Sequence, residues 1–153
     1  MNTNILDKID YAILEILSSE GRISITELSA RVGLSKTPCQ ARLRRLQTDG
    51  FIVGFSAVLN PSKLGRDHVA FVEVRLNDTS ERALNRFNKA VQAISEIEQC
   101  HMIAGAFDYL LKVRTQDIKL YRQVLGEKIS TLPHVANTST HISMESVKEH
   151  TLS

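Results

Sequence analysis

Five basic side chains and no acidic one lie between Glu27 and Asp49, in a chain whose formal net charge is only +2. They are Arg31, Lys36, Arg42, Arg44 and Arg45. Duplex DNA carries one phosphate charge per about 1.7 Å of its axis, so cations fixed on one protein face gain affinity by releasing counterions. This local charge predicts a surface that docks phosphates. Charge alone leaves open the alternative of a solvated basic face that binds nothing.

The spacing within this segment also fits the reading of bases. Lys36, Gln40 and Arg44 recur every fourth residue with Thr37 beside them, so a helix would place all four on one face. Arg and Lys can read guanine and Gln can read adenine in the major groove. We predict these four as base contacts. The other predicted DNA contacts are Arg42 and Arg45 for phosphates, Arg31 at the end of the preceding helix, and Ser35 at the helix start.

A second candidate site is the segment Gly105-Ala-Phe-Asp-Tyr109, which lies between two expected strands. Glycine allows a sharp turn or the close approach of a ligand. Asp108 could receive an ammonium group, or it could accept hydrogen bonds from local N–H groups in a plain strand connection. From these residues alone, the plain connection is the preferred interpretation.

Metal and catalytic chemistry find little support in the sequence. The histidines are not spaced as zinc ligands, neither cysteine lies near enough to complete a site, and His101 and His141 fall within expected strands. The nucleophile pattern GxSxG and the phosphate-binding patterns GxxxxGK[ST] and GxGxxG are absent. We therefore predict no enzyme activity, no metal and no cofactor.

Three helices are expected to present the basic segment, at about residues 7–19, 25–32 and 35–49. Ser24 or Thr26 would cap the second helix, and Gly33 supplies the turn that follows it. The third helix would start at Ser35, or at Thr37 with Pro38 in the first helical position. Beyond Gly50 the apolar residues alternate, which predicts a short hairpin or wing and then a linker.

The second half alternates between strand and helix patterns, separated from the first by the turn-forming run 60–65. The expected elements are strand 68–76, helix 80–94, strands 97–104 and 107–115, helix 117–129 and strand 135–145. This βαββαβ order predicts a ferredoxin-like sandwich with helices on one sheet face. The predicted fold is therefore α+β, with a winged helix-turn-helix domain at residues 1–60 and a ferredoxin-like domain at 66–153.

Composition agrees with a soluble protein of one or two small domains. The chain has 153 residues, of which 42% are hydrophobic and 24% are charged. No apolar run approaches the roughly 20 residues that span a bilayer. The acidic N-terminus makes a poor signal peptide, and two widely separated cysteines are typical of reduced thiols, so we expect a cytoplasmic protein.

The chain resembles the Lrp/AsnC family of feast/famine transcriptional regulators, especially its leucine-responsive branch. The resemblance spans about residues 6–149 and includes the order of helix-turn-helix, linker and βαββαβ. The matching segments are LDKIDYAIL (6–14), GRISITELSARVGLSKTPCQARLRRLQTDGFI (21–52), Leu59-Asn60-Pro61, QCHMIAGAFDYLLKVRT (99–115) and YRQVLGEKISTLPHV (121–135).

This resemblance implies a nucleoid-associated regulator of amino-acid metabolism that binds duplex DNA. It also implies dimers formed through the C-terminal domain, assembly to octamers or similar discs, and an amino-acid effector bound between dimers. The effector residues that the resemblance implies are Gly105, Ala106, Asp108, Tyr109, Ser130, His141, Ile142 and Ser143. Two departures stand out: Lys36 replaces a frequent proline, and Ser130 with His141-Ile142-Ser143 makes a more polar pocket than a leucine-responsive one.

Two other classes remain as alternatives. One is a metabolic enzyme, or a ligand domain that regulates one, carrying a cryptic helix-turn-helix; the absence of catalytic motifs argues against it. The other is RNA binding, because βαββαβ is also the order of the RRM fold. RRM sheets expose paired aromatic side chains, and the one close pair in this chain is Phe107 and Tyr109.

Overall fold

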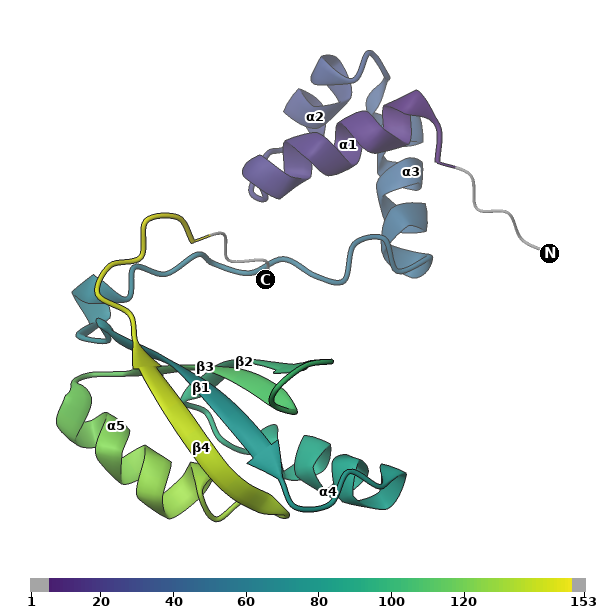
Figure 1. The fold of residues 1–153 in the computed structure, drawn as a ribbon. Coiled ribbons are helices and arrows are strands. Elements are labelled where there is room, and N and C mark those ends of the chain that lie inside the picture. Colours follow the sequence, from purple (N-terminus) through teal and green to yellow (C-terminus); the bar gives the residue numbers. More distant parts are fainter. Residues whose placement is uncertain (1–5, 150–153) are drawn as a thin grey trace. The chain divides into compact units, whose positions relative to one another are not determined.

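The computed structural model describes residues 6–149 and divides the chain into two compact units, one up to Val58 and one from Leu59 onward (Figure 1). Each unit has its own hydrophobic core. Within the described range, no helix combines the length and apolar character needed to cross a membrane.

The N-terminal unit contains the three predicted helices, α1 (Lys8–Ser19), α2 (Ile25–Arg31) and α3 (Lys36–Thr48). Ile13, Leu28, Cys39 and Leu46 form its buried core, one or two from each helix. Ser24 caps α2 by accepting a hydrogen bond from the Glu27 N–H, which decides between the two candidate caps. Gly33 has a φ of 72°, so the turn between α2 and α3 uses a left-handed conformation that favours glycine.

The start of α3 follows the first of the two predicted alternatives. Ser35 is the N-cap residue and Lys36 is the first helical residue, so Pro38 occupies the third helical position. A cap hydroxyl often binds the third helical N–H, but proline has none, and no side-chain cap bond forms at Ser35. The first turn of α3 therefore keeps unpaired N–H groups.

Residues 51–60 do not form the predicted hairpin, since the structure assigns no strand to them. The alternation of apolar residues in this segment predicts a paired strand, but no other segment of the described chain pairs with residues 51–60. Most of its large apolar side chains are consequently exposed, and Val53 retains 88% of its surface, whereas Ile52 packs against the core of the helices. The paired-wing prediction is wrong for the single chain, whereas the three helices are confirmed.

The C-terminal unit has the predicted βαββαβ order. Its elements are a 3-10 turn (Ser62–Leu64), β1 (His68–Leu76), α4 (Glu81–Val91), β2 (Ile97–Met102), β3 (Tyr109–Thr115), α5 (Ile118–Val124) continued by a π-helical turn (Leu125–Ile129), and β4 (Val135–Ile142). The four strands form one antiparallel sheet in the order β2-β3-β1-β4. Both helices lie on one face of this sheet (Figure 1), which confirms the ferredoxin-like prediction.

The core of this unit fills the space between the sheet and its two helices. Ala70, Val72 and Val74 alternate along β1 toward that space and meet Phe87 of α4 and Tyr121 of α5. The intervening β1 residues lie on the other sheet face, which neither helix covers. The connection between β2 and β3 and the end of β4 are thus left at the edges of a helix–sheet sandwich.

Candidate nucleic-acid interface and effector region

The exposed face of α3 carries the four residues predicted to contact bases. Lys36, Thr37, Gln40 and Arg44 are all exposed, whereas Cys39 on the opposite side is fully buried. Burial of Cys39 and Leu46 fixes the rotation of the helix, so the polar face must point to solvent. The helix therefore presents two cations, an amide and a hydroxyl together, the set of groups that reads base edges.

The three arginines predicted to contact phosphates are instead bound to carboxylates. Arg31 donates to Glu20 at 2.6 Å and 3.1 Å and to Glu27 at 2.6 Å. Hydrogen bonds from Arg31 hold the pKa of Glu20 below its usual value. These contacts tie α2 to the end of α1, so Arg31 has a structural role that the sequence prediction missed.

Arg42 and Arg45 reach from α3 to the start of α1. Arg42 donates to Asp7 at 2.6 Å and to Asp10 at 2.9 Å, and Arg45 donates to Asp10 at 2.6 Å. Asp7 and Asp10 also form a capping box, in which each side chain accepts from the other's N–H. Burial raises the pKa of Asp10, but hydrogen bonds from Arg45, the Asp7 N–H and Arg42 outweigh it and lower the pKa to about 2.

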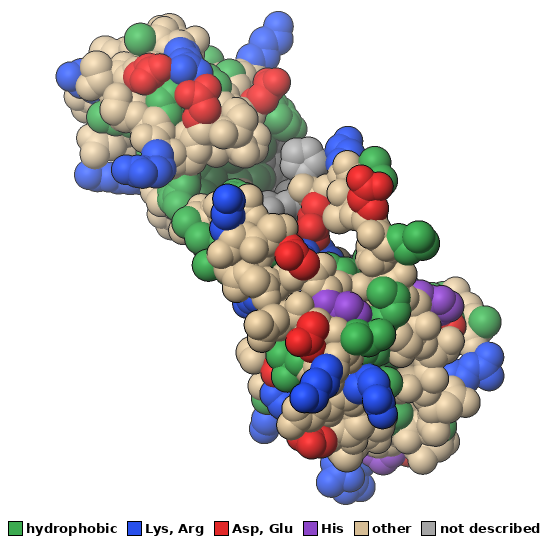
Figure 2. All heavy atoms as spheres, turned by 90° about the vertical axis from the view of Figure 1, so that its left-hand side faces the viewer, with side chains coloured by type: hydrophobic (Ala, Val, Ile, Leu, Met, Phe, Trp, Pro, Cys, Tyr) green, Lys and Arg blue, Asp and Glu red, His purple; other side chains and the backbone are tan. Residues whose placement is uncertain are grey.

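These ion pairs reduce the free positive charge of the basic segment. Of its five cations, Lys36 and Arg44 are those that form no ion pair with any residue in 6–149. Positive and negative side chains are interspersed on the molecular face shown in Figure 2. The free positive charge of the segment is therefore confined to the solvent face and first turn of α3. Ser35 is also exposed there.

Asp108 binds the backbone of its own unit. Its Oδ2 accepts from the Leu76 N–H at 2.7 Å, its N–H donates to the Val74 carbonyl, and its carbonyl accepts from the Ile103 N–H. Leu76 lies where the register of β1 and β4 shifts, so the carboxylate satisfies a donor that the sheet leaves free. Asp108 therefore accepts a hydrogen bond from a local N–H group, as the interpretation of a plain strand connection predicts.

The neighbours of Asp108 in this loop differ in accessibility. Gly105 and Ala106 are exposed, whereas Tyr109 is 2% exposed and its hydroxyl donates to Asn88 of α4 at 2.8 Å. The Tyr109 ring packs on Phe87 in the core, so its side chain is not available to a surface ligand. It is equally unavailable to stack on a base, which removes the aromatic pair on which the RNA-binding alternative depended.

The remaining effector candidates lie elsewhere in the unit. His141 and Ile142 are exposed on β4, and the Ser143 N–H donates to the Val69 carbonyl near the start of β1. His141 pairs with Phe71, whereas Asp108 binds at Leu76, five residues along β1 or about 16 Å at the usual strand rise. Ser130 is exposed at the end of the π-helical turn. A single chain does not bring the Asp108 and His141 groups together.

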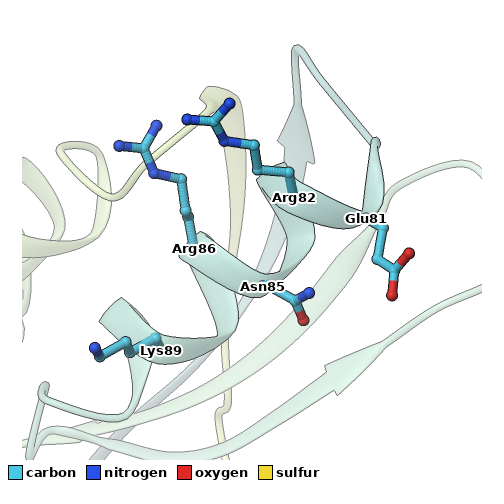
Figure 3. Close-up of a pocket in the computed structure, with 5 residues that line it drawn as sticks. All are labelled: Glu81, Arg82, Asn85, Arg86 and Lys89. Atoms are coloured by element: carbon cyan, nitrogen blue, oxygen red, sulfur yellow. The ribbon is translucent and has the colours of Figure 1, made fainter.

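A shallow groove of about 520 Å³, which no sequence pattern predicts, lies along the outer side of α4. Its lining residues are Glu81, Arg82, Asn85, Arg86 and Lys89. Arg82 and Arg86 extend in the same direction from the helix (Figure 3). All five side chains come from one helix and are exposed, so the groove lacks the enclosure that small-molecule sites usually have. The described residues also contain no group of three potential metal ligands.

Comparisons with known proteins agree with this architecture. Residues 6–53 match a family model described as winged helix-turn-helix DNA-binding, and residues 69–153 match one described as the Lrp/AsnC ligand binding domain. The chain is 67% identical over 147 residues to the proline dehydrogenase transcriptional activator of Rhizobium radiobacter, covering 96% of this chain and 94% of that protein. It is 50% identical over 144 residues to the leucine-responsive regulatory protein of Escherichia coli K12, covering 94% and 88%.

A solved structure gives the same fold. The L-Met complex of a transcriptional regulator from Neisseria meningitidis superposes with a TM-score of 0.89 at 28% identity, and the match covers 96% of this chain and 95% of that one.

Proposed function

The chain belongs to the Lrp/AsnC family of DNA-binding transcriptional regulators, and from this premise we propose how it reads DNA and what it senses. Its relatives are regulators and not enzymes, so the chain itself is a transcriptional regulator. We further propose which residues contact the operator, which effector binds and how the chain assembles. We also propose that the protein acts with the DNA in the cytoplasm.

We propose that α3 enters the major groove and reads bases through Lys36, Thr37, Gln40 and Arg44. The exposure of these four side chains on the face opposite Cys39 and Leu46 is the observation that carries the proposal. The first turn of α3 also supports a phosphate contact, because the Ser35 hydroxyl is not used as a cap and helix N-terminal N–H groups attract anions. Arg31, Arg42 and Arg45 are left out because each already binds carboxylates.

Arg44→Ala tests the role of α3. A bidentate contact of Arg44 with guanine is worth about 1–3 kcal/mol of discrimination, so the preference for operator over scrambled duplex should fall by that amount. Fluorescence anisotropy with both duplexes at fixed salt measures it. Arg22→Ala is the matched control, because Arg22 is exposed outside α3 and should affect both duplexes equally. An equal loss on both duplexes for Arg44→Ala would remove it from the base-reading set.

We propose that the effector is a small amino acid. Two comparisons support this proposal. One relative is named a proline dehydrogenase transcriptional activator, and one structural neighbour was solved with L-methionine. The polar candidates Ser130, His141 and Ser143 favour a ligand other than leucine, and proline is the first compound to test. The corresponding target is a gene for proline breakdown.

The proposed effector site is formed between copies of the chain. Asp108, with the exposed Gly105 and Ala106, lies about 16 Å along β1 from His141 and Ile142, so one chain does not close a pocket around a small amino acid. Two copies that meet near the loop between β2 and β3 would supply both groups. The sheet face that neither helix covers supplies a separate surface for dimerisation, and dimers would then associate further.

A thermal-shift screen of the twenty amino acids tests the effector proposal. A compound that binds only the folded protein at 100 times its Kd stabilises it by about 2.7 kcal/mol, so one or a few amino acids should raise the Tm clearly. The screen is repeated with operator-length DNA to detect coupling. If none of the twenty raises the Tm under either condition, the amino-acid effector is excluded.

A further inference from the structure

The interface between α1 and α3 contains a buried carboxylate whose function goes beyond packing, provided that α3 reads DNA as proposed above. Asp10 is 1% exposed and accepts hydrogen bonds from three donors: the Asp7 N–H, Arg42 and Arg45. Asp7, half exposed, binds Arg42 a second time. The sequence separations of 32 and 35 residues between donor and acceptor show that these bonds depend on the tertiary fold.

Arg45 lies beside the reading face of α3, whereas Arg42 lies farther around the helix. Arg45 directly follows Arg44, which corresponds to a rotation of about 100° around the helix. A free Arg45 would be within reach of a DNA backbone that α3 contacts. Phosphate contacts add equally to the affinity for any sequence, because they carry no base information. Arginines that are neutralised on site contribute little to this non-specific term.

The burial of Asp10 opposes an exchange in which Arg42 and Arg45 leave its carboxylate and bind DNA phosphates. If Arg42 and Arg45 turned outward, a carboxylate that is 1% exposed in the folded protein would lose both cationic partners. Breaking one side of a buried ion pair is strongly unfavourable for this reason. We therefore expect Arg45 to stay on Asp10 when DNA is bound.

We propose that Asp10 determines specificity by withholding Arg45 from DNA phosphates, while Asp7 and Asp10 together hold Arg42. Asp10 is a positioning residue in this scheme, because it acts through the arginines and does not touch DNA. The ion pairs keep the non-specific affinity low, so the contacts of Lys36, Gln40 and Arg44 decide where the protein binds.

Asp10→Asn tests the proposal directly. Each arginine that gains a phosphate should steepen the slope of log K against log salt concentration by about 0.9. Non-specific affinity should rise at low salt, and the ratio of operator to scrambled binding should fall. Between 50 and 200 mM salt, one extra contact adds a roughly three- to fourfold loss of affinity. Glu15→Gln is the matched control, since it removes one exposed α1 carboxylate that forms no ion pair in the described structure.

A steeper slope for Asp10→Asn, but not for Glu15→Gln, supports the proposal, because simple loss of structure would lower affinity without raising non-specific binding. An unchanged or shallower slope in a folded variant overturns it. Circular dichroism establishes whether the variant is folded.

A second pair of variants keeps the test decisive if Asp10→Asn does not fold. Arg45→Gln should leave the salt slope unchanged, whereas Arg44→Gln should lower the ratio of operator to scrambled binding. If Arg45→Gln makes the slope shallower, Arg45 contacts phosphate and the proposal is overturned. Wild-type protein that shows no salt-dependent binding to any duplex would instead contradict the proposed DNA reading by α3.

Discussion

Asp108 has a structural role and a proposed recognition role, and two substitutions can separate them. Asp108→Asn keeps an oxygen that can accept from the Leu76 N–H but removes the negative charge. We expect its thermal stability to stay near wild type. Asp108→Ala should lose about 1–3 kcal/mol, because it leaves a half-buried N–H without its partner.

Both Asp108 variants should respond weakly to the amino-acid effector if the carboxylate receives its ammonium group. Effector titrations followed by thermal shift measure this, with unfolding curves alongside. A normal titration for Asp108→Asn would restrict Asp108 to its backbone role at the β1 register shift.

Asp10 also makes a specific prediction for acid unfolding. Its pKa is about 2 in the folded protein, below the ordinary 3.8, because its hydrogen-bonded ionised form is favoured despite burial. Its contribution, on the order of 2 kcal/mol, is therefore fully present above pH 3.8 and is lost as pH falls toward 2. Urea unfolding at several pH values should show a smaller fall in stability from pH 4 to 2 for Asp10→Asn than for wild type. Equal pH dependence would contradict the depressed pKa.

The residue types of the site were predictable, but their ion pairing was not. Helical periodicity placed Lys36, Gln40 and Arg44 on one face, because a local rule governs which residues share a helix face. Arg42 and Arg45 flank that face, which predicts phosphate contacts. Their carboxylate partners lie more than 30 residues away at the start of α1, and no local pattern links them. The one local signal was the Asp7–Asp10 spacing, which is that of a capping box.

At the scale of elements, the turn between α2 and α3 depends on a left-handed backbone conformation. Gly33 has a φ of 72°, and no atom lies within 4 Å of an added Cβ, so Gly33→Ala meets backbone strain but no clash. A side chain in this conformation costs roughly 1–2 kcal/mol. We expect Gly33→Ala to lower the Tm and reduce operator affinity. Gly105→Ala is the control, because Gly105 lacks a positive φ and its Cβ would make ordinary contact. Equal stability of the two variants would contradict this expectation.

The order of elements followed from the sequence because hydrophobic period changes from 3.6 to 2 and back at turn-forming residues. The same rule failed at residues 51–60. Alternation specifies which side chains share a face, but a strand also needs a partner for its backbone, and no local pattern supplies that information. The π-helical turn at Leu125–Ile129 likewise had no sequence signal.

At the scale of the whole molecule, the uncovered sheet face is the proposed dimer interface. Phe71 is 37% exposed there, and its register partners Lys112 and His141 share the face. Lys112 and Arg114 bind Glu98 and Glu149 on the same side, so part of the charge is already neutralised. Sedimentation at micromolar concentration should show dimers or larger species. Phe71→Glu should shift the distribution toward monomer, and a wild-type monomer would contradict the dimer interface.

Coupling between the effector and DNA must also be reciprocal. If an amino acid changes operator affinity by a given factor, saturating operator must change the affinity for that amino acid by the same factor, because the two equilibria form a closed cycle. The coupling arises only if the effector binds two assembly or domain states with different affinity. We expect calorimetric titration of the effector with and without operator duplex to give a Kd ratio equal to that from DNA titrations with and without effector. Scrambled duplex is the control. Effector binding that leaves operator affinity unchanged would show that the ligand site is not linked to DNA reading.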